Sequence, residues 1–353
     1  MLHSNDNSPQ LANDQRQMPH HTTTIPISYV HSMLHGVRAR GLAQESFLGI
    51  AGIAPELLEE ASARVTVDQY VKLFKALVEG MDDDFLGLQS RPLRRGSFAL
   101  IARSAVSAPT LEVAIRRIGR TYRLLQDDVC IKLVHDGSQV GFTLQFSDPN
   151  RQWPVFLHEL LLRVFWRLLA WFVGGKFPIT RFEFAFARPE NAHIYDRVFP
   201  SPLSFDCAHS AFWFDEARLQ HRVRQDETSL FKFLANAQEN VILPRRATDS
   251  MSASVRSFLQ QRYPQWPDMA STAGALNVSN ATLQRHLAAE GTTFQALKDA
   301  LRRDIAIHRL HTSTVTLPVL ASELGFSDST AFQRAFKGWT GSAPGAYRRR
   351  TLA

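Results

Sequence analysis

The stretch AGALNVSNATLQRHL (Ala273–Leu287) returns 48 residues later, in altered form, as ASELGFSDSTAFQRAF (Ala321–Phe336). In both copies a short apolar segment runs into Asn277 or Gly325, and these two residue types best tolerate the left-handed backbone of a sharp turn. A second segment with apolar residues at helical spacing follows each turn. Helix, tight turn and second helix is the helix-turn-helix pattern, in which the second helix enters the major groove of DNA. The repeat therefore predicts two such modules.

A serine stands two residues after each turn, and serine is a preferred N-cap of a helix. Ser279 and Ser327 are therefore expected to cap the second helix of the two copies. Copy two has one extra residue after Ser327, at the start of that helix. The modules are expected at about residues 268–288 and 317–338.

The positive charge of the chain is concentrated in the same region. The formal net charge is +7, and residues 245–353 hold fourteen Lys and Arg against seven Asp and Glu, so the rest of the chain is balanced. A polyanionic partner favours such a surface, because cations that neutralise phosphates release condensed counterions. A merely solvated basic surface is the alternative, and the repeat makes it the weaker one.

A long helix is predicted between the two modules, over Thr293 to Leu310. At about 1.5 Å per residue it is roughly 27 Å long. Such a spacer can hold two recognition helices about one DNA turn apart, near 34 Å, along one face of the duplex. Its expected apolar face consists of Phe294, Leu297, Leu301, Ile305 and His308.

The periodicity of the first 240 residues indicates an α+β fold. Helices are expected over residues 24–122, of which Leu111–Leu125 with Thr110 as N-cap is the clearest. An antiparallel sheet covered by one helix is expected to follow. Its strands are expected at residues 129–134, 140–146, 180–186, 203–205 and 211–214, and its helix at residues 155–174.

A length of 353 residues predicts two or three domains. We expect a disordered tail at residues 1–22, a regulatory and dimerisation domain at residues 23–240, a linker at residues 241–247 and an all-α DNA-binding domain at residues 248–353. The tail is polar and has no apolar segment typical of a signal peptide.

Several other classes of protein are disfavoured. The apolar segment 155–174 contains His158, Glu159, Arg163 and Arg167, which argues against a membrane span. Leu162 stands where a zinc-peptidase helix needs its second histidine. No nucleophile elbow, phosphate-binding glycine loop or metal-ligand spacing was found, so neither an enzyme nor a cofactor is expected. Only two cysteines, Cys130 and Cys207, fit a reducing cytoplasm.

The two modules resemble the DNA-binding domain of the AraC/XylS family of bacterial transcription regulators. The motifs that carry this resemblance are LGFS (Leu324–Ser327), RAFK (Arg334–Lys337), Trp339, Gly341, Pro344 and Tyr347–Arg348. The N-terminal region is similar to that of the ornithine-utilisation regulators in this family, through SAPTL (Ser107–Leu111) and FPSPLSF (Phe199–Phe205). That similarity implies a sensor domain and leaves the ligand open.

The resemblance assigns roles within the modules. It places on the base-reading face Ala281, Gln284 and Arg285 of copy one, and Ser329, Thr330, Gln333 and Arg334 of copy two. Ser279, Thr282, Ser327, Lys337 and Arg348 are expected at phosphates. The family often has a large residue where this chain has Ala281, so copy one is expected to make fewer base contacts. The alternative for Arg285 and Arg334 is a solvent-facing or phosphate-bound side chain.

These observations predict a cytoplasmic, homodimeric regulator of transcription that binds double-stranded promoter DNA and a small-molecule effector, and that contacts RNA polymerase if it is an activator. Aromatic residues of segment 155–174 could line an effector pocket, but an aromatic stripe at helical spacing is more often core. A ligand-independent regulator, whose N-terminal domain only dimerises or contacts proteins, is the alternative.

Overall fold

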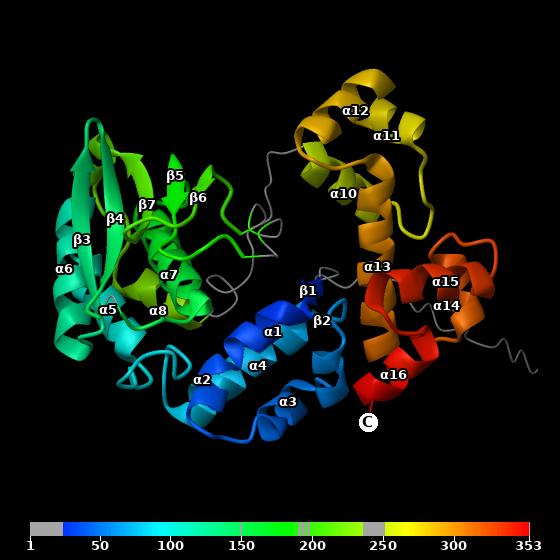
Figure 1. Ribbon diagram of the computed structural model, residues 1–353. Coiled ribbons are helices and arrows are strands. Elements are labelled where there is room, and N and C mark those ends of the chain that lie inside the picture. Colours follow the sequence, from blue (N-terminus) through cyan, green and yellow to red (C-terminus); the bar gives the residue numbers. More distant parts are fainter. Residues whose placement is uncertain are drawn as a thin grey trace, which may run out of the picture.

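The computed structural model describes residues 24–148, 150–189, 192, 195, 198–235 and 251–352, with side chains up to Arg348. The predicted tail at residues 1–22 and linker at residues 241–247 lie outside the described residues. Three parts are visible in Figure 1: a helical N-terminal part, a part built on a sheet, and a helical C-terminal part. The predicted α+β region followed by an all-α region is therefore confirmed.

The helical N-terminal part contains a two-stranded ribbon that the sequence did not predict. β1 (Thr24–Pro26) pairs antiparallel with β2 (Arg64–Thr66). Thr66 also forms a capping box with Gln69, which fixes the start of the helix that follows β2. The helices of this part are α1 (Ile27–Met33), α2 (His35–Ala39), α3 (Glu45–Ala51), the 3-10 helix η1 (Pro55–Glu59) and α4 (Val67–Met81).

The second part begins with the antiparallel helices α5 (Ser97–Val106) and α6 (Leu111–Leu125). α6 has the predicted bounds, and Thr110 caps it by accepting from the backbone N–H of Val113. The strands are β3 (Val129–Asp136), β4 (Gln139–Phe146), β5 (Arg181–Glu183), β6 (Leu203–Ser204) and β7 (Ser210–Asp215), and the other helices are α7 (Val155–Phe172), η3 (Glu216–Gln220) and α8 (Glu227–Ala235).

The sheet has the order β3-β4-β7-β5-β6 and differs from the prediction in two respects. β5 is shorter than the expected strand and pairs parallel with β6, because the chain makes a crossover between them. Two helices rather than one cover the same sheet face: Gly119 of α6 lies against Ile131, and Phe165 of α7 packs on Phe142 with ring centroids 5.4 Å apart.

The aromatic residues of α7 are core, as expected from their spacing. Phe156, Phe165, Trp166 and Phe172 are buried. Trp171 is half-buried and stacks on Phe233 of α8, with centroids 4.6 Å apart. The aromatic stripe of α7 is therefore packed into the core between the helix and the sheet.

The C-terminal part consists of seven helices in the described range 251–352 (Figure 1). Module one is α11 (Met269–Ala275) and α12 (Asn280–Ala289), and module two is α14 (Leu317–Glu323) and α15 (Ser329–Thr340). The remaining helices are α10 (Met251–Gln261), α13 (Phe294–Thr312) and α16 (Pro344–Leu352). Asn277 and Gly325 have φ values of 56° and 71°, so both predicted left-handed turns are present.

Candidate nucleic-acid interface

α12 carries the candidate base-reading residues of module one on its solvent side. Leu283 and Leu287 are buried in the core, whereas Ala281, Gln284 and Arg285 are exposed. The Ser279 hydroxyl accepts from the backbone N–H of Thr282 at 3.1 Å, so this serine is the predicted N-cap. The helix therefore has one apolar side that fixes it and one free side that can enter a groove.

α15 repeats this arrangement in module two. Phe332 and Phe336 are fully buried. On the other side Thr330, Gln333 and Arg334 are exposed and Ser329 is half-buried. The Gln-Arg pair of each copy thus occupies equivalent solvent-facing positions, as the repeat implies.

The cap of α15 differs from the prediction. Asp328, not Ser327, is the N-cap, and its carboxylate accepts from the backbone N–H of Ala331 at 2.8 Å. The extra residue of copy two shifts the cap by one position, so the Ser327 hydroxyl lies outside the helix and donates to Asp328 at 3.2 Å. This hydrogen bonding lowers the pKa of Asp328, chiefly through the bond from Ala331.

The residues expected at phosphates have different surroundings. Ser279, Ser327 and Lys337 are exposed, and Thr282 is half-buried. Arg348 is half-buried, and its Nη2 donates to the carbonyl of Val315, just before module two. Arg348 therefore has a structural contact in addition to the phosphate role expected of it.

α13 connects the modules and is close to the predicted helix. It has 19 residues, and Thr293 caps it by accepting from the backbone N–H of Ala296. At about 1.5 Å per residue its length is roughly 28 Å. On its predicted apolar face Leu301 and Ile305 are buried, while Phe294, Leu297 and His308 are half-buried. The two modules are thus attached to the two ends of one continuous helix.

The β1–β2 ribbon contacts the middle of α13, as Figure 1 shows at the junction of the two parts. Thr24 of β1 donates to Oδ1 of Asp304 at 2.5 Å, and Arg256 of α10 donates to Oδ2 of the same carboxylate at 2.6 Å. Asp304 is only 2% exposed. A buried carboxylate is costly unless it is paired, so β1 and α10 both satisfy Asp304 of α13, and the loss of either partner would be destabilising.

A second contact joins the N-terminal part to the end of the DNA-binding region. The Tyr347 hydroxyl of α16 donates to the carbonyl of Arg64 in β2. The Ser342 hydroxyl, between α15 and α16, donates to Glu60 at 3.1 Å. The N-terminal part is therefore bound to the residues that directly follow module two as well as to the connecting helix.

A charged cluster is buried where α7 meets the helices that follow the ribbon strands. Glu159 and Arg163 of α7 are 5% and 2% exposed. Tyr195 donates to Glu159, and Tyr70 of α4 lies beside the Arg163 guanidinium. Nε and Nη2 of Arg163 have no hydrogen-bond acceptor among the described residues. Burying charged groups costs solvation free energy, which their mutual attraction and hydrogen bonds must offset.

Burial dominates the titration of this cluster. It raises the pKa of Glu159 despite the hydrogen bond from Tyr195 and the charge of Arg163. It also raises the pKa of Tyr70 to about 12, although the positive charge of Arg163 acts in the opposite direction. The sequence identified Glu159 and Arg163 only as charges that exclude a membrane span.

A hollow of about 480 Å3 lies on the surface between the β3–β4 turn and η3. Three carboxylates line it, but each has a partner. Arg116 pairs with Glu112 at 2.8 Å, His135 with Glu216 at 3.0 Å, and Asp215 caps η3. Each carboxylate that lines the hollow therefore already has a partner within the protein.

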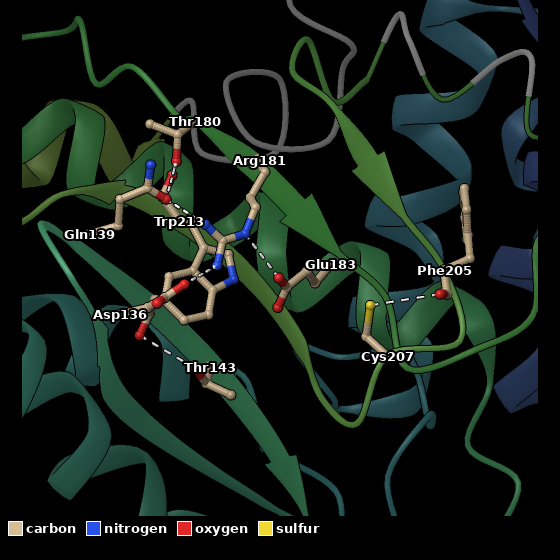
Figure 2. A network of polar contacts seen from close by, with 10 residues as sticks. Asp136, Gln139, Thr143, Thr180, Arg181, Glu183, Phe205, Cys207 and Trp213 are labelled. Carbon is tan, nitrogen blue, oxygen red and sulfur yellow. Dashed lines mark hydrogen bonds and ion pairs between the residues drawn. The ribbon is translucent and has the colours of Figure 1, made fainter.

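Figure 2 shows a polar network on the sheet face away from α7. The Arg181 guanidinium stacks 4.0 Å from the Trp213 ring centroid and pairs with Glu183 at 2.9 Å and Asp136 at 3.0 Å. Trp213 lies flat over Gly141, where an added Cβ would come within 2.9 Å of the ring. The charge of Arg181 is neutralised within the network, which therefore ties β3, β4, β5 and β7 together.

Within the described residues no helix is long and apolar enough to span a membrane, which agrees with the reading of segment 155–174 as a core helix.

Two helix-turn-helix modules on one rigid helix, with solvent-facing Gln-Arg pairs, define a DNA-binding protein of the double-module class. Comparisons with known proteins agree. Residues 41–223 match the family model described as the arabinose-binding domain of AraC transcription regulator, N-terminal, and residues 272–350 match a helix-turn-helix domain model. The chain belongs to the AraC family of transcription regulators.

Two regulators are similar to nearly the whole chain. The chain is 26% identical to the ornithine utilization regulator of Pseudomonas aeruginosa over 325 residues, 92% of this chain and 96% of that protein. It is 24% identical to the regulator VirS of Mycobacterium tuberculosis over 317 residues, 88% of this chain and 92% of that protein. The crystal structure of the regulator CdpR of Pseudomonas aeruginosa matches 94% of this chain and 99% of its own, with 19% identity and a TM-score of 0.32. These relatives are transcription regulators and not enzymes.

Proposed function

We propose that α12 and α15 read base edges in two successive major grooves of promoter DNA. The observation that carries this proposal is the repeated exposure of a Gln-Arg pair on the solvent side of each helix, opposite a buried apolar side. Arg285 and Arg334 would pair with guanine O6 and N7, and Gln284 and Gln333 with adenine N6 and N7. Ala281, Ser329 and Thr330 complete the proposed base-reading surface.

Phosphate contacts are proposed for Ser279, Thr282, Ser327, Lys337 and Arg348. Such contacts set the position of the protein on the duplex without reading sequence. The exposed Lys337 is a suitable reference, because it lies on α15 with Arg334 and carries the same charge. Comparing the two therefore separates base reading from electrostatic attraction.

The test is a binding titration of full-length Arg285→Ala, Arg334→Ala and Lys337→Ala on operators selected from random DNA by the wild-type chain. Each arginine variant should lose about 1 to 3 kcal/mol on the operator and little on random DNA. Arg285→Ala should relax specificity in one half of the operator only. Lys337→Ala should weaken both DNAs alike and flatten the slope of log affinity against log salt by about one unit. Equal losses on operator and random DNA for the arginine variants would show that they hold phosphates.

We further propose that a small-molecule effector binds the N-terminal domain and changes DNA binding. The support is a continuous series of contacts from α7 to α13. Tyr70 of α4 lies beside Arg163 of α7, and α4 begins directly after β2. β2 pairs with β1, and Thr24 of β1 donates a hydrogen bond to Asp304 of α13. A ligand that moves α4 against α7 would therefore move the ribbon against the connecting helix. Part of the free energy of ligand binding can reach the DNA-binding region by this route.

A thermal-shift screen with amino acids (including ornithine, after the name of one relative), fatty acids and aromatic acids tests effector control. A ligand that binds only the folded state raises its melting temperature. It should also change the operator affinity, and Thr24→Val should reduce that change by cutting the contact to Asp304. A ligand that shifts melting but never operator affinity would contradict the proposed coupling.

The second candidate is a ligand-independent regulator with an N-terminal domain that only dimerises. Three exposed large apolar residues favour a dimer surface: Leu100 (49% exposed), Leu124 (77%) and Phe231 (73%). They lie on α5, α6 and α8, of which α5 packs against both others. In sedimentation velocity the full-length chain should be a dimer, and Leu124→Glu should weaken it. A contact with RNA polymerase belongs to the proposal only if the protein activates transcription.

A further inference from the structure

The segment between α10 and α11 precedes module one in the sequence but contacts module two. The Trp266 indole donates to the carbonyl of Glu323 at 2.9 Å, at the end of α14. The Tyr263 hydroxyl donates to the Glu323 carboxylate at 2.8 Å, and Arg309 of α13 pairs with the same carboxylate at 3.3 Å. Two separate segments, the one between α10 and α11 and the connecting helix α13, therefore meet at one residue of module two.

The connecting helix holds Trp266 from the other side. The Arg302 guanidinium lies 5.0 Å from the ring centroid of Trp266 and 5.0 Å from that of Phe326, which follows the turn of module two. Nη2 of Arg302 donates to the carbonyl of Gly325 at 3.2 Å, and Nζ of Lys298 donates to the carbonyl of Trp266 at 3.3 Å. Arg302 is thus sandwiched between an aromatic residue before module one and an aromatic residue within module two.

The contact is close as well as polar. A Cβ added at Gly325 would come 2.6 Å from Cδ1 of Trp266. The turn of module two therefore presses its backbone directly against the indole ring. Asn277, the equivalent residue of module one, is exposed and carries a full side chain.

We infer that Trp266 fixes the distance and the rotation between α12 and α15, and that it thereby restricts the spacing of the two half-operators. Without it, module two would keep its polar contacts with Tyr263, Arg302 and Arg309. It would lose the indole ring that packs directly against the Gly325 backbone and limits how the modules rotate about the short turns at residues 290–293 and 313–316. One added base pair moves a half-site by about 3.4 Å and rotates it by about 34°, since a turn of DNA holds about 10.5 base pairs in roughly 34 to 36 Å. If the modules could move relative to each other, both recognition helices could still reach their half-sites after such a change. With Trp266 fixing the distance and rotation between them, they cannot. This inference rests on the proposed two-module reading of DNA.

The test uses full-length protein and operators selected by the wild-type chain, with the half-site spacing changed by one base pair in either direction. The wild type should lose about tenfold or more in affinity when the spacing changes, comparable to at least one mismatched base pair. Trp266→Ala should bring the three spacings to within about threefold of each other, mainly by gaining relative affinity for the wrong ones. Gln265→Ala is the matched control, because Gln265 is the exposed neighbour of Trp266, and it should keep the wild-type spacing profile.

Circular dichroism and denaturant unfolding establish that the variants are folded. Trp266→Phe keeps an aromatic ring beside Arg302 but loses the donor to Glu323, so its spacing preference should be intermediate. If Trp266→Ala does not fold, the spacing preference of Trp266→Phe tests the inference instead. An unchanged ratio of affinities in a folded Trp266 variant would overturn the inference, even if absolute affinity falls. A wild-type chain that selects only single half-sites would instead contradict the proposed two-module function, which is a different result.

Discussion

The two helix-turn-helix modules follow one sequence pattern but are held in different ways. Module one has a small aliphatic core around Leu283 and Leu287, and the exposed Asn277 forms its turn. Module two has an aromatic core in which Phe332 lies 5.7 Å from Phe336 and Phe336 lies 5.4 Å from Tyr347 of α16. It also contacts the segment around Trp266, and Ser342, directly after it, contacts the N-terminal part.

This difference shows that a repeated motif determines the local fold, while its surroundings determine which residues are required in each copy. The turn needs a left-handed residue in both modules, so Asn and Gly are equally suitable on local grounds. Only in module two does a neighbouring ring remove the space for a side chain. Module two is therefore expected to tolerate substitution at its turn less well than module one.

The largest effect is expected from exchanging the two turn residues. Gly325→Asn should destabilise the protein by about 1 to 3 kcal/mol, because its Cβ would overpack against Trp266. Asn277→Gly should change the free energy of unfolding by less than about 1 kcal/mol, through backbone entropy alone. Denaturant unfolding of the full-length variants measures both. Equal destabilisation by the two substitutions would mean that the Trp266 contact does not distinguish the modules. The double variant Gly325→Asn, Trp266→Ala is the control, and it should recover part of the stability that Gly325→Asn loses.

A smaller difference is expected at the two serines that precede the second helices. Ser279→Ala removes the N-cap of α12 and should destabilise by about 1 kcal/mol. Ser327→Ala removes no cap and should cost less than about 0.5 kcal/mol, the usual range for surface substitutions. Thermal unfolding of the two variants and the wild type measures both changes in stability. A larger loss for Ser327→Ala would show that this serine supports α15 in spite of the cap at Asp328.

The sequence predicted the elements whose patterns are local. The bounds of α6, the cap at Thr110 and both left-handed turns follow from residues close together in the chain. The aromatic stripe of α7 was also correctly interpreted as core, because helical spacing alone places it on one buried side. Within the candidate interface, the exposure of Arg285 and Arg334 agrees with the repeat, and their contact with bases stays a prediction.

The features that the sequence did not predict depend on distant partners. The three-residue strands β1 and β2 become recognisable only by pairing with each other across about 40 residues. Asp304 stands in the charged run Arg302-Arg303-Asp304 and has no local pattern of burial, because its partner Thr24 is 280 positions away. Trp266 lies between two prolines, so the sequence alone suggests only a loop between helices. Periodicity describes one element at a time, so it cannot identify contacts of this kind.

The smallest predicted effect is the response of the two recognition helices to acid. A serine hydroxyl caps α12, whereas the Asp328 carboxylate caps α15, and hydrogen bonding holds the pKa of that carboxyl below its ordinary value of 3.8. The folded state therefore binds fewer protons at Asp328 than the unfolded state, so the stabilisation is present above pH 3.8 and is lost as the pH falls through the lowered pKa. Amide exchange between about pH 5 and about pH 3 should show growing loss of protection in the first turn of α15 and a smaller change in α12, beyond the intrinsic effect of pH. Exchanging the caps, with Ser279→Asp and Asp328→Ser, should move this sensitivity from α15 to α12. If the first turn of α15 stays the more sensitive one after the exchange, the cap is not its cause, and the asymmetry comes from the different surroundings of the two modules.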